Sequence, residues 1–333
     1  MNLVETALAA AVATPFALGL AASGPDRPRP EFEFRDPQIV ESSGLVARDG
    51  LFVTVNDSGD TGRIFVVDPA SGRTVGSAAW DAEATDVEAL APTDDGTVLV
   101  GDIGDNAGSR DSVRILEVPM TRGDRSVEPP LSELTYAGGP TDAEALLVHP
   151  GSGQLLIASK GLFGGVLYAA PAGFEMGAGP DRPTRLEAIG DVIGLVTDGA
   201  FFPDGRHFVL RDYGRAVVYS YPALSAVGSF TLPDQPQGEG IAVDEDGSVF
   251  VSTEGQFTSV LRVPLPLRIA RVVDPAPSPT TDPGPDVESL PDEGDQPLTE
   301  PATEPDRPAW PWLLGGAVGA AALAVLLRAL RPR

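Results

Sequence analysis

The stretch EALAPTDDGTVLVGD, residues 88–102, decides the fold, because it joins two short apolar strands through an Asp-Gly turn and has an acid at each end. Two apolar strands around such a turn predict a β-hairpin. Four other segments follow the same plan: SGLVARDGLFVTVND (43–57), EALLVHPGSGQLLIAS (144–159), DGAFFPDGRHFVLRD (198–212) and EGIAVDEDGSVFVST (239–253). The chain is therefore built on a repeated hairpin.

A third apolar run follows every hairpin, as in RIFVVD at 63–68, and a more polar fourth run follows most of these. The hairpins begin 41 to 56 residues apart. Four antiparallel strands at such intervals are typical of propeller blades. We predict an all-β propeller over residues 31–273 with five four-stranded blades and room for a sixth. EFEFRD near residue 31 and LRIARVV near 267 are both candidates for the strand that closes the ring.

The two ends of the chain predict a protein anchored in a bacterial membrane. Residues 310–328 predict one transmembrane helix, because the run from Trp310 to Leu327 is uncharged and long enough to cross a membrane, and the arginines at 328, 331 and 333 predict that the tail at 329–333 is cytoplasmic. Residues 1–23 resemble a signal peptide. Residues 274–309 hold ten acids and one Arg among many prolines, which predicts an extended stalk. The propeller is thus expected to be extracytoplasmic and the protein single-pass.

The composition restricts the partners. The chain has 48 acidic and 23 basic residues, a formal net charge of −25, and no cysteine. Such a surface repels nucleic acid and attracts cations. The absence of cysteine removes disulfides and thiolate metal sites. Both histidines, His149 and His207, fall in hairpin turns, where we predict surface positions and no Ser-His-Asp triad.

Propeller geometry gathers many carboxylates at one end of the central channel. The first strand of a blade lines the channel and the second runs back beside it, so the start of one and the end of the other meet at the same mouth. The acids at these positions are Asp57, Asp86, Glu88, Asp102, Asp142, Glu144, Asp198, Asp212 and Glu239. Close carboxylates raise one another's pKa or bind a cation, and Ca²⁺ prefers oxygen ligands. We therefore predict a Ca²⁺ site at this acidic mouth.

Residue type and position suggest roles within the mouth. The candidate Ca²⁺ ligands are Glu88, Asp102, Asp105, Glu144, Asp198 and Glu239, and the candidate ligand-binding residues are Asp57, Lys160, Arg211 and Asp212. The loops NDSGDTGR (56–63) and GDIGDNAGSR (101–110) support this prediction, because Gly permits a sharp turn and each Asp offers oxygens. The alternative is structural: each acid caps a turn or accepts hydrogen bonds from the backbone of the next blade.

The D-x-E-A-L hairpins at 86–90 and 142–146, the GDIGDN loop at 101–106 and the stretch GEGIAVDEDGSVFVSTEG at 238–255 resemble extracytoplasmic propellers of the phytase-like and gluconolactonase-like groups. The resemblance covers most of residues 38–265. It implies Ca²⁺ held by acids at the mouth, with Glu88, Glu144 and Glu239 on the metal side and Asp102 and Asp212 in support. The chain departs from the phytase pattern because it lacks a cluster of Lys and Arg for a polyphosphate.

Three functions remain open at this point. The first is a cell-surface module that binds a divalent cation and engages a small ligand, a glycan or a protein at the mouth. The second is a metal-dependent hydrolase of a phosphoester, ester or lactone, with Glu88 or Glu239 as general base. The third is a structural envelope protein without a small-molecule site.

Overall fold

The computed structural model describes residues 27–57, 60–81, 84–177 and 179–273. Four predicted segments lie outside these residues: the signal peptide (1–23), the stalk (274–309), the transmembrane helix (310–328) and the tail (329–333). In the described part of the chain, no helix combines the length and the apolar character that a membrane span requires.

The described strands lie in four hydrogen-bonded sheets of four, eight, four and five strands, and the antiparallel runs within these sheets follow one another along the chain as four-stranded units. The first unit contains β2 (Ser42–Arg48), β3 (Leu51–Asn56), β4 (Arg63–Asp68) and β5 (Arg73–Ala79). The second contains β6 (Val87–Pro92), β7 (Thr97–Asp102), β8 (Val113–Pro119) and β10 (Leu131–Tyr136). The third contains β11 (Ala143–Val148), β12 (Leu155–Ser159), β13 (Gly165–Ala169) and β14 (Gly179–Val192). The fourth contains β15 (Asp198–Phe201), β16 (His207–Arg211), β17 (Arg215–Ser220) and β18 (Ala226–Thr231).

The fifth unit brings the two ends of the propeller sequence together. Its strands are β19 (Gly238–Val243), β20 (Val249–Thr253), β21 (Ser259–Val263) and, from the N-terminal side, β1 (Arg29–Glu33). β1 pairs antiparallel with β21, so the EFEFRD segment supplies the closing strand. The competing LRIARVV segment is instead the helix α2 (Leu267–Val273). Closure by the N-terminal strand ties the start of the described chain to its end.

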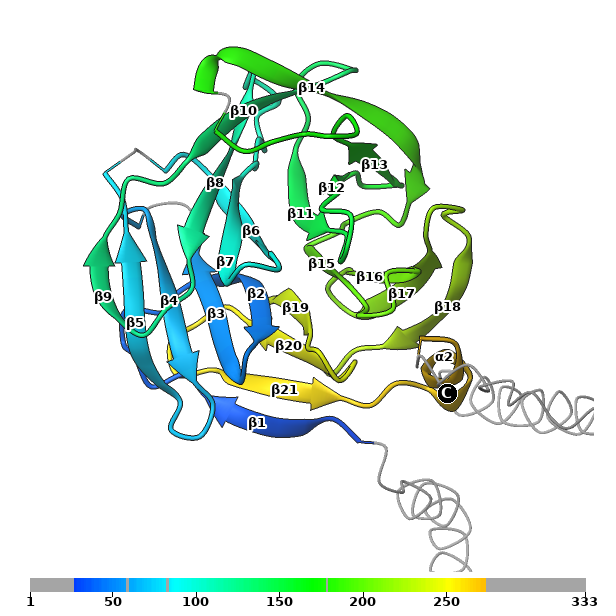
Figure 1. Cartoon of the computed structure of the whole chain (residues 1–333). Helices are drawn as coiled ribbons and strands as arrows, with labels where there is room; N and C mark the ends of the chain where they lie inside the picture. Colours follow the sequence, from blue (N-terminus) through cyan, green and yellow to red (C-terminus); the bar gives the residue numbers. More distant parts are fainter. Residues whose placement is uncertain (1–26, 58–59, 82–83, 178, 274–333) are drawn as a thin grey trace, which may run out of the picture. The chain divides into compact units, whose positions relative to one another are not determined.

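The first strands β2, β6, β11, β15 and β19 lie next to one another in a closed ring, with the other strands of each unit further out (Figure 1). This radial arrangement is a β-propeller. Two parallel pairings add to it: β14 joins the edge of β10, and the short β9 (Gly123–Ser126) joins the edge of β5. The predicted all-β architecture is confirmed.

The hydrophobic core is a ring of five clusters, one between each pair of neighbouring units. In one of them the rings of Phe52 and Phe250 meet edge to face at 5.0 Å between the first and fifth units. Units packed on both faces need continuous apolar strands, which explains sequences such as RIFVVD. Burying each large apolar side chain contributes about 1.5–3 kcal/mol.

Candidate functional site

The acidic mouth depends on irregular pairing at the start of the first strands. Register shifts occur where β6, β11 and β19 begin, between Val87 and Ala89, Ala143 and Ala145, and Gly238 and Ile241. Glu88, Glu144 and Glu239 therefore stand within β-bulges, and a bulge re-aims the side chain that it carries. β15 pairs regularly from its first residue, Asp198. These glutamates and Asp198 consequently have different surroundings.

The bulged glutamates are buried and hold their protons tightly. Only 6% of Glu88 is exposed, and burial, followed by the charges of Glu144 and Asp57, raises its pKa to about 9. Burial also raises the pKa of Glu239 to about 7, against the opposing charge of Lys160. The pKa of Asp86 is raised by partial burial and by Asp57 and Asp142. Each ionised carboxylate at the mouth makes ionisation of the others less favourable unless a positive charge compensates it.

Three of these acids converge closely enough to share one ion. Carboxylate oxygens of Asp57, Asp86 and Glu88 all lie within 4.8 Å of one another. Gly104 faces the same group, since a Cβ built on it would lie 2.5 Å from Asp86 Oδ2 and 2.9 Å from Glu88 Oε1. The absence of a side chain therefore lets the two carboxylates lie directly against the backbone of this loop. The D-x-E pattern at 86–88 indicates that Asp86 and Glu88 lie on the same face of a strand. The sequence gives no indication that Asp57 and Gly104 lie beside them, because that contact depends on the fold.

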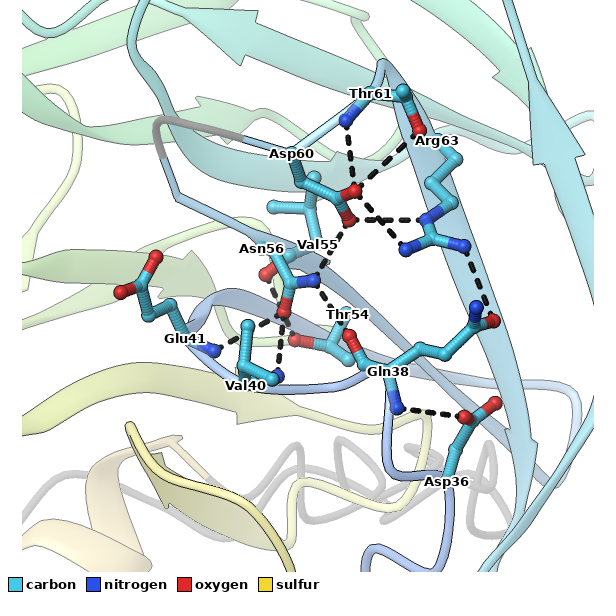
Figure 2. Close-up of polar contacts among 10 residues, drawn as sticks. All are labelled: Asp36, Gln38, Val40, Glu41, Thr54, Val55, Asn56, Asp60, Thr61 and Arg63. Atoms are coloured by element: carbon cyan, nitrogen blue, oxygen red, sulfur yellow. Dashed lines mark hydrogen bonds and ion pairs between the residues drawn. The ribbon is translucent and has the colours of Figure 1, made fainter.

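A polar network around Asn56 and Asp60 joins the described residues at the end of β3 and before β4 (Figure 2). Asn56 Nδ2 donates to Asp60 Oδ2 at 2.8 Å, while Asn56 Oδ1 accepts from the backbone N–H of Val40 at 3.0 Å. Arg63 donates to both oxygens of Asp60 at 3.0 Å. Although partial burial acts in the opposite direction, the hydrogen bonds from Arg63 and Asn56 lower the pKa of Asp60. Asp60 thus holds its own loop, and Asp57 is the acid that this loop brings to the mouth.

The loop after β7 uses its acids in the same way. Asp102 accepts from Arg110 at 2.9 Å and from Arg114 at 2.7 Å, and from the backbone N–H of Asp86 at 3.0 Å. Asp105 accepts from the backbone N–H groups of Ser109 and Arg110 at 2.9 and 3.0 Å. Both carboxylates organise the loop that places Gly104, so we leave Asp102 and Asp105 out of the candidate cation site.

Asp198 joins three units of the propeller. It is fully buried, and its Oδ2 accepts from the backbone N–H of Ile241 at 2.8 Å and of Leu45 at 3.3 Å. Arg211, also fully buried, donates to the carbonyl oxygen of Gly240 at 2.9 Å. These contacts agree with the structural alternative, in which an acid accepts hydrogen bonds from neighbouring blades. Both oxygens of Asp198 are occupied by backbone N–H groups, and this acid does not belong to the carboxylate trio.

Lys160 and Asp212 lie on the third and fourth units at the same end. Lys160 Nζ is bonded to Glu144 Oε1 and lies 5.5 Å from the centre of the Tyr213 ring. Asp212 accepts from the backbone N–H of Arg215 at 2.7 Å and from its guanidinium at 3.1 Å, so it holds its own turn. Lys160 supplies the positive charge nearest the bulged glutamates, whereas Asp212 is occupied locally.

Glu239 makes the stability of the cation-free protein depend on pH. Its pKa rises from the ordinary 4.5 to about 7 because the carboxyl is buried. The folded protein therefore binds this proton more tightly than the unfolded chain. Its stabilisation is complete below the unfolded pKa and is lost as the pH rises through the folded pKa. From this group we expect the Tm in EDTA to fall by about 5 °C between about pH 5 and pH 8.

Thermal melting followed by circular dichroism measures this slope. Glu239→Gln cannot titrate and should make the slope shallower by this contribution, whereas Glu245→Gln, an exposed change at the other end of the channel, should leave the slope as in the parent protein. A slope unchanged in Glu239→Gln would contradict the assignment.

The opposite end of the channel is lined mainly by apolar side chains, with Arg48, Asp94, Asp244 and Glu245 also in the lining. A cavity of about 270 Å³ there is lined by the far ends of all five first strands and their turns, including Leu90, Leu147, Ala200 and Val243. His207 at this end is buried, and its Nδ1 lies 2.6 Å from Asp204 Oδ2. The predicted surface position of His207 is therefore wrong, because Asp204 folds back over the turn to pair with it.

The described residues thus define a β-propeller with an acidic channel mouth. No family model and no curated protein matches the sequence. Among solved structures, glutaminyl cyclase from Myxococcus xanthus is 16% identical with a TM-score of 0.46, and the match covers 72% of this chain and 99% of that one. The PQQ-bound aldose sugar dehydrogenase from Streptomyces coelicolor is 11% identical with a TM-score of 0.41, over 73% of this chain and 99% of the other. A glucose dehydrogenase is 10% identical with a TM-score of 0.46, over 72% and 100%.

Proposed function

We propose that this protein is a five-bladed, cell-surface propeller that binds Ca²⁺ at Asp57, Asp86 and Glu88 and engages a ligand at its acidic mouth. The observation that carries the proposal is the convergence of three carboxylate oxygens within 4.8 Å. Ionised carboxylates at that separation repel one another unless a cation compensates them. Calcium suits a set of oxygen donors, and the resemblance to calcium-binding propellers supports the same ion.

The surrounding residues fit a hard cation. Gly104 lets the backbone of its loop approach the carboxylates of Asp86 and Glu88 closely, and Ser43 Oγ donates to the carbonyl oxygen of Glu88 at 2.7 Å, which steadies the bulge. Ca²⁺ takes six to eight oxygen ligands, and three side chains supply only part of that number. The remaining positions suit water and oxygen atoms of a ligand. When bound, the ion would attract anionic or hydroxyl-bearing groups to the mouth.

The cellular location belongs to the same proposal. It rests on the sequences of 1–23 and 310–328, which predict export and a single membrane anchor with the C-terminus in the cytoplasm. A propeller held on a stalk at the outer face of the membrane meets glycans, surface proteins and small solutes. The acidic mouth makes nucleic acid an unsuitable partner.

A metal-dependent hydrolase of a lactone, ester or phosphoester is the second candidate, and Glu239 favours it. A carboxyl with a pKa of about 7 can accept a proton near neutral pH, which is the property of a general base. Lys160 acts on Glu239 electrostatically, and its ammonium group would stabilise an oxyanion. A purely structural mouth is the third candidate.

Calcium titration of the full chain tests the proposal, with calorimetry for affinity and thermal melting for stability. We expect binding to raise the Tm, because calcium at about a hundred times its Kd adds about 2.7 kcal/mol to stability. Glu88→Gln should weaken binding about tenfold or more, since it removes one charged ligand. Asp94→Asn, an exposed change at the other end of the same unit, is the matched control and should bind as the parent does.

The outcomes separate the three candidates. Absence of binding at millimolar calcium would contradict the cation site and leave the structural reading. Binding without turnover of lactones, carboxylic esters or phosphate monoesters supports the binding module. Turnover that requires calcium and is lost in Glu239→Gln would identify the hydrolase.

A further inference from the structure

Large apolar side chains surround the acidic mouth although they are exposed to solvent. Nine large hydrophobic residues are exposed in the described ranges, and three of them lie on β14 and α2. The other six lie in loops at the mouth, either before a first strand or between a second and a third strand: Val40, Leu162, Phe163, Leu195, Tyr213 and Phe257. Exposed apolar residues scatter on an ordinary surface, so their concentration at one end points to an interaction surface.

Two of these residues are held in an unfavourable backbone conformation. Leu195 has a φ of 55° and Phe257 a φ of 57°, in the left-handed region that bulky residues rarely adopt. Their side chains are 36% and 48% exposed, so burial does not compensate the strain. Strained residues that persist are concentrated at functional sites.

Backbone contacts gather the six residues into two patches. The N–H of Leu195 donates to the carbonyl oxygen of Gly161 at 2.9 Å, which fastens the loop of Leu195 to that of Leu162 and Phe163. Lys160, beside the same loop, lies over the ring of Tyr213. We call the four exposed apolar residues of this group the Phe163 patch: Leu162, Phe163, Leu195 and Tyr213. The N–H of Gly255 donates to the carbonyl oxygen of Val40 at 3.0 Å, so Val40 and Phe257 form the second, or Phe257, patch.

Acids lie next to the Phe257 patch. Glu254 precedes Phe257 in the same loop. Partial burial, followed by the nearby charges of Asp57 and Glu41, raises the pKa of Glu254. Gln237 Nε2 donates to Glu254 Oε1 at 2.6 Å and orients that carboxylate. A basic group that reached this corner would meet several negative charges at once. Acidic and apolar surface therefore adjoin around the mouth. We call the Phe163 and Phe257 patches together the rim of the mouth.

We propose that the rim is a docking surface for a segment of another protein that presents apolar side chains beside a lysine or arginine. The apolar side chains would contact the Phe163 and Phe257 patches, and the basic side chain would reach Glu254 and Glu41. An anionic membrane is a poor occupant, because the acids repel its headgroups. This surface goes beyond the proposed function and does not require bound calcium.

The test uses random peptides displayed on phage and selected on the full chain in EDTA, followed by fluorescence anisotropy with the recovered peptides. We expect enrichment of sequences with Lys or Arg next to Trp, Phe, Leu or Ile. Phe163→Ser and Phe257→Ser should each weaken these peptides about tenfold, as exposed aromatic anchors do in interfaces. Glu254→Gln should weaken them less and reduce the salt dependence.

Leu267→Ser is the matched control, because it removes an exposed apolar side chain from α2 and should leave peptide affinity unchanged. Enrichment without the basic and apolar pattern, or equal affinity for all variants, would overturn the proposal. So would tighter binding to zwitterionic vesicles that disappears in Phe163→Ser, since that result would assign the rim to a membrane.

Glycine substitutions separate docking from folding. Leu195→Gly and Phe257→Gly relieve the left-handed strain, so we expect the Tm to stay level or rise while peptide affinity falls about tenfold. A fall in Tm that parallels the loss of affinity would show that these side chains serve the fold, and would count against the docking surface.

Discussion

Replacing Asp198 by Ala should lower the free energy of unfolding by about 3–5 kcal/mol, because it leaves several buried backbone donors without an acceptor. Asp198 accepts backbone hydrogen bonds from Leu45 in the first unit and Ile241 in the fifth, and from its own neighbour Gly199 at 2.8 Å. The variant would leave these N–H groups without an acceptor in a site closed to water. It would also remove the carboxyl whose charge favours the buried guanidinium of Arg211.

Urea unfolding of the full chain, followed by circular dichroism, measures this loss. Asp198→Asn keeps one oxygen acceptor and should lose about 2 kcal/mol, since its amide opposes the remaining donors. Asp212→Ala, a partly exposed acid in the same unit, should lose less than about 1 kcal/mol. A loss below about 1 kcal/mol for Asp198→Ala would contradict the role of this side chain in joining the units.

Gly104→Ala should reduce calcium affinity about a hundredfold while changing stability little, because it places a methyl group where the carboxylates of Asp86 and Glu88 converge. The added Cβ would lie 2.5 Å from Asp86 Oδ2 and 2.6 Å from Asp86 Cγ, so that side chain has to turn away. The Asp86 carboxylate is the end of a rotatable side chain and can move without shifting the backbone. Gly104 has no positive φ, so Ala fits its backbone.

Calorimetry of the full chain with calcium measures the affinity, and urea unfolding in EDTA measures the stability. Gly138→Ala is the matched control, since nothing lies within 4 Å of its added Cβ. It should bind calcium as the parent does. Unchanged calcium affinity in Gly104→Ala would remove this glycine from the proposed site, and a large loss of stability in EDTA would make it a packing residue.

The repeated hairpins were sufficient to predict the propeller, because strand-turn-strand patterning is local and each unit carries its own copy. The closing strand was not predictable in this way. EFEFRD and LRIARVV are both apolar segments at the edge of the repeat, and the choice depends on which of them can reach β21. The N-terminal segment pairs with β21, and the other one forms α2.

The sequence predicted which acids lie at the mouth, but it did not show which of them have oxygens available for a cation. Asp60, Asp102 and Asp105 stand in loops that look like cation loops, yet arginines or backbone N–H groups occupy their oxygens. These arginines lie within a few residues of the acids that they bind, so the sequence partly indicated that these acids are paired. The exposed apolar rim, by contrast, comes from loops spread from Val40 to Phe257 and had no local signature.

Taken by itself, the sequence determined the strand pattern, the repeated turns and the presence of an acidic or polar residue at the ends of each hairpin, since these follow from periodicity and turn chemistry within a few residues. Only the tertiary structure decided what each acid does. A bulge at the start of β6, β11 and β19 re-aims Glu88, Glu144 and Glu239, whereas regular pairing of β15 leaves Asp198 buried between units. The meeting of Asp57 with Asp86 and Glu88 likewise depends on the packing of one unit against the next, because no local pattern specifies contacts between residues thirty positions apart.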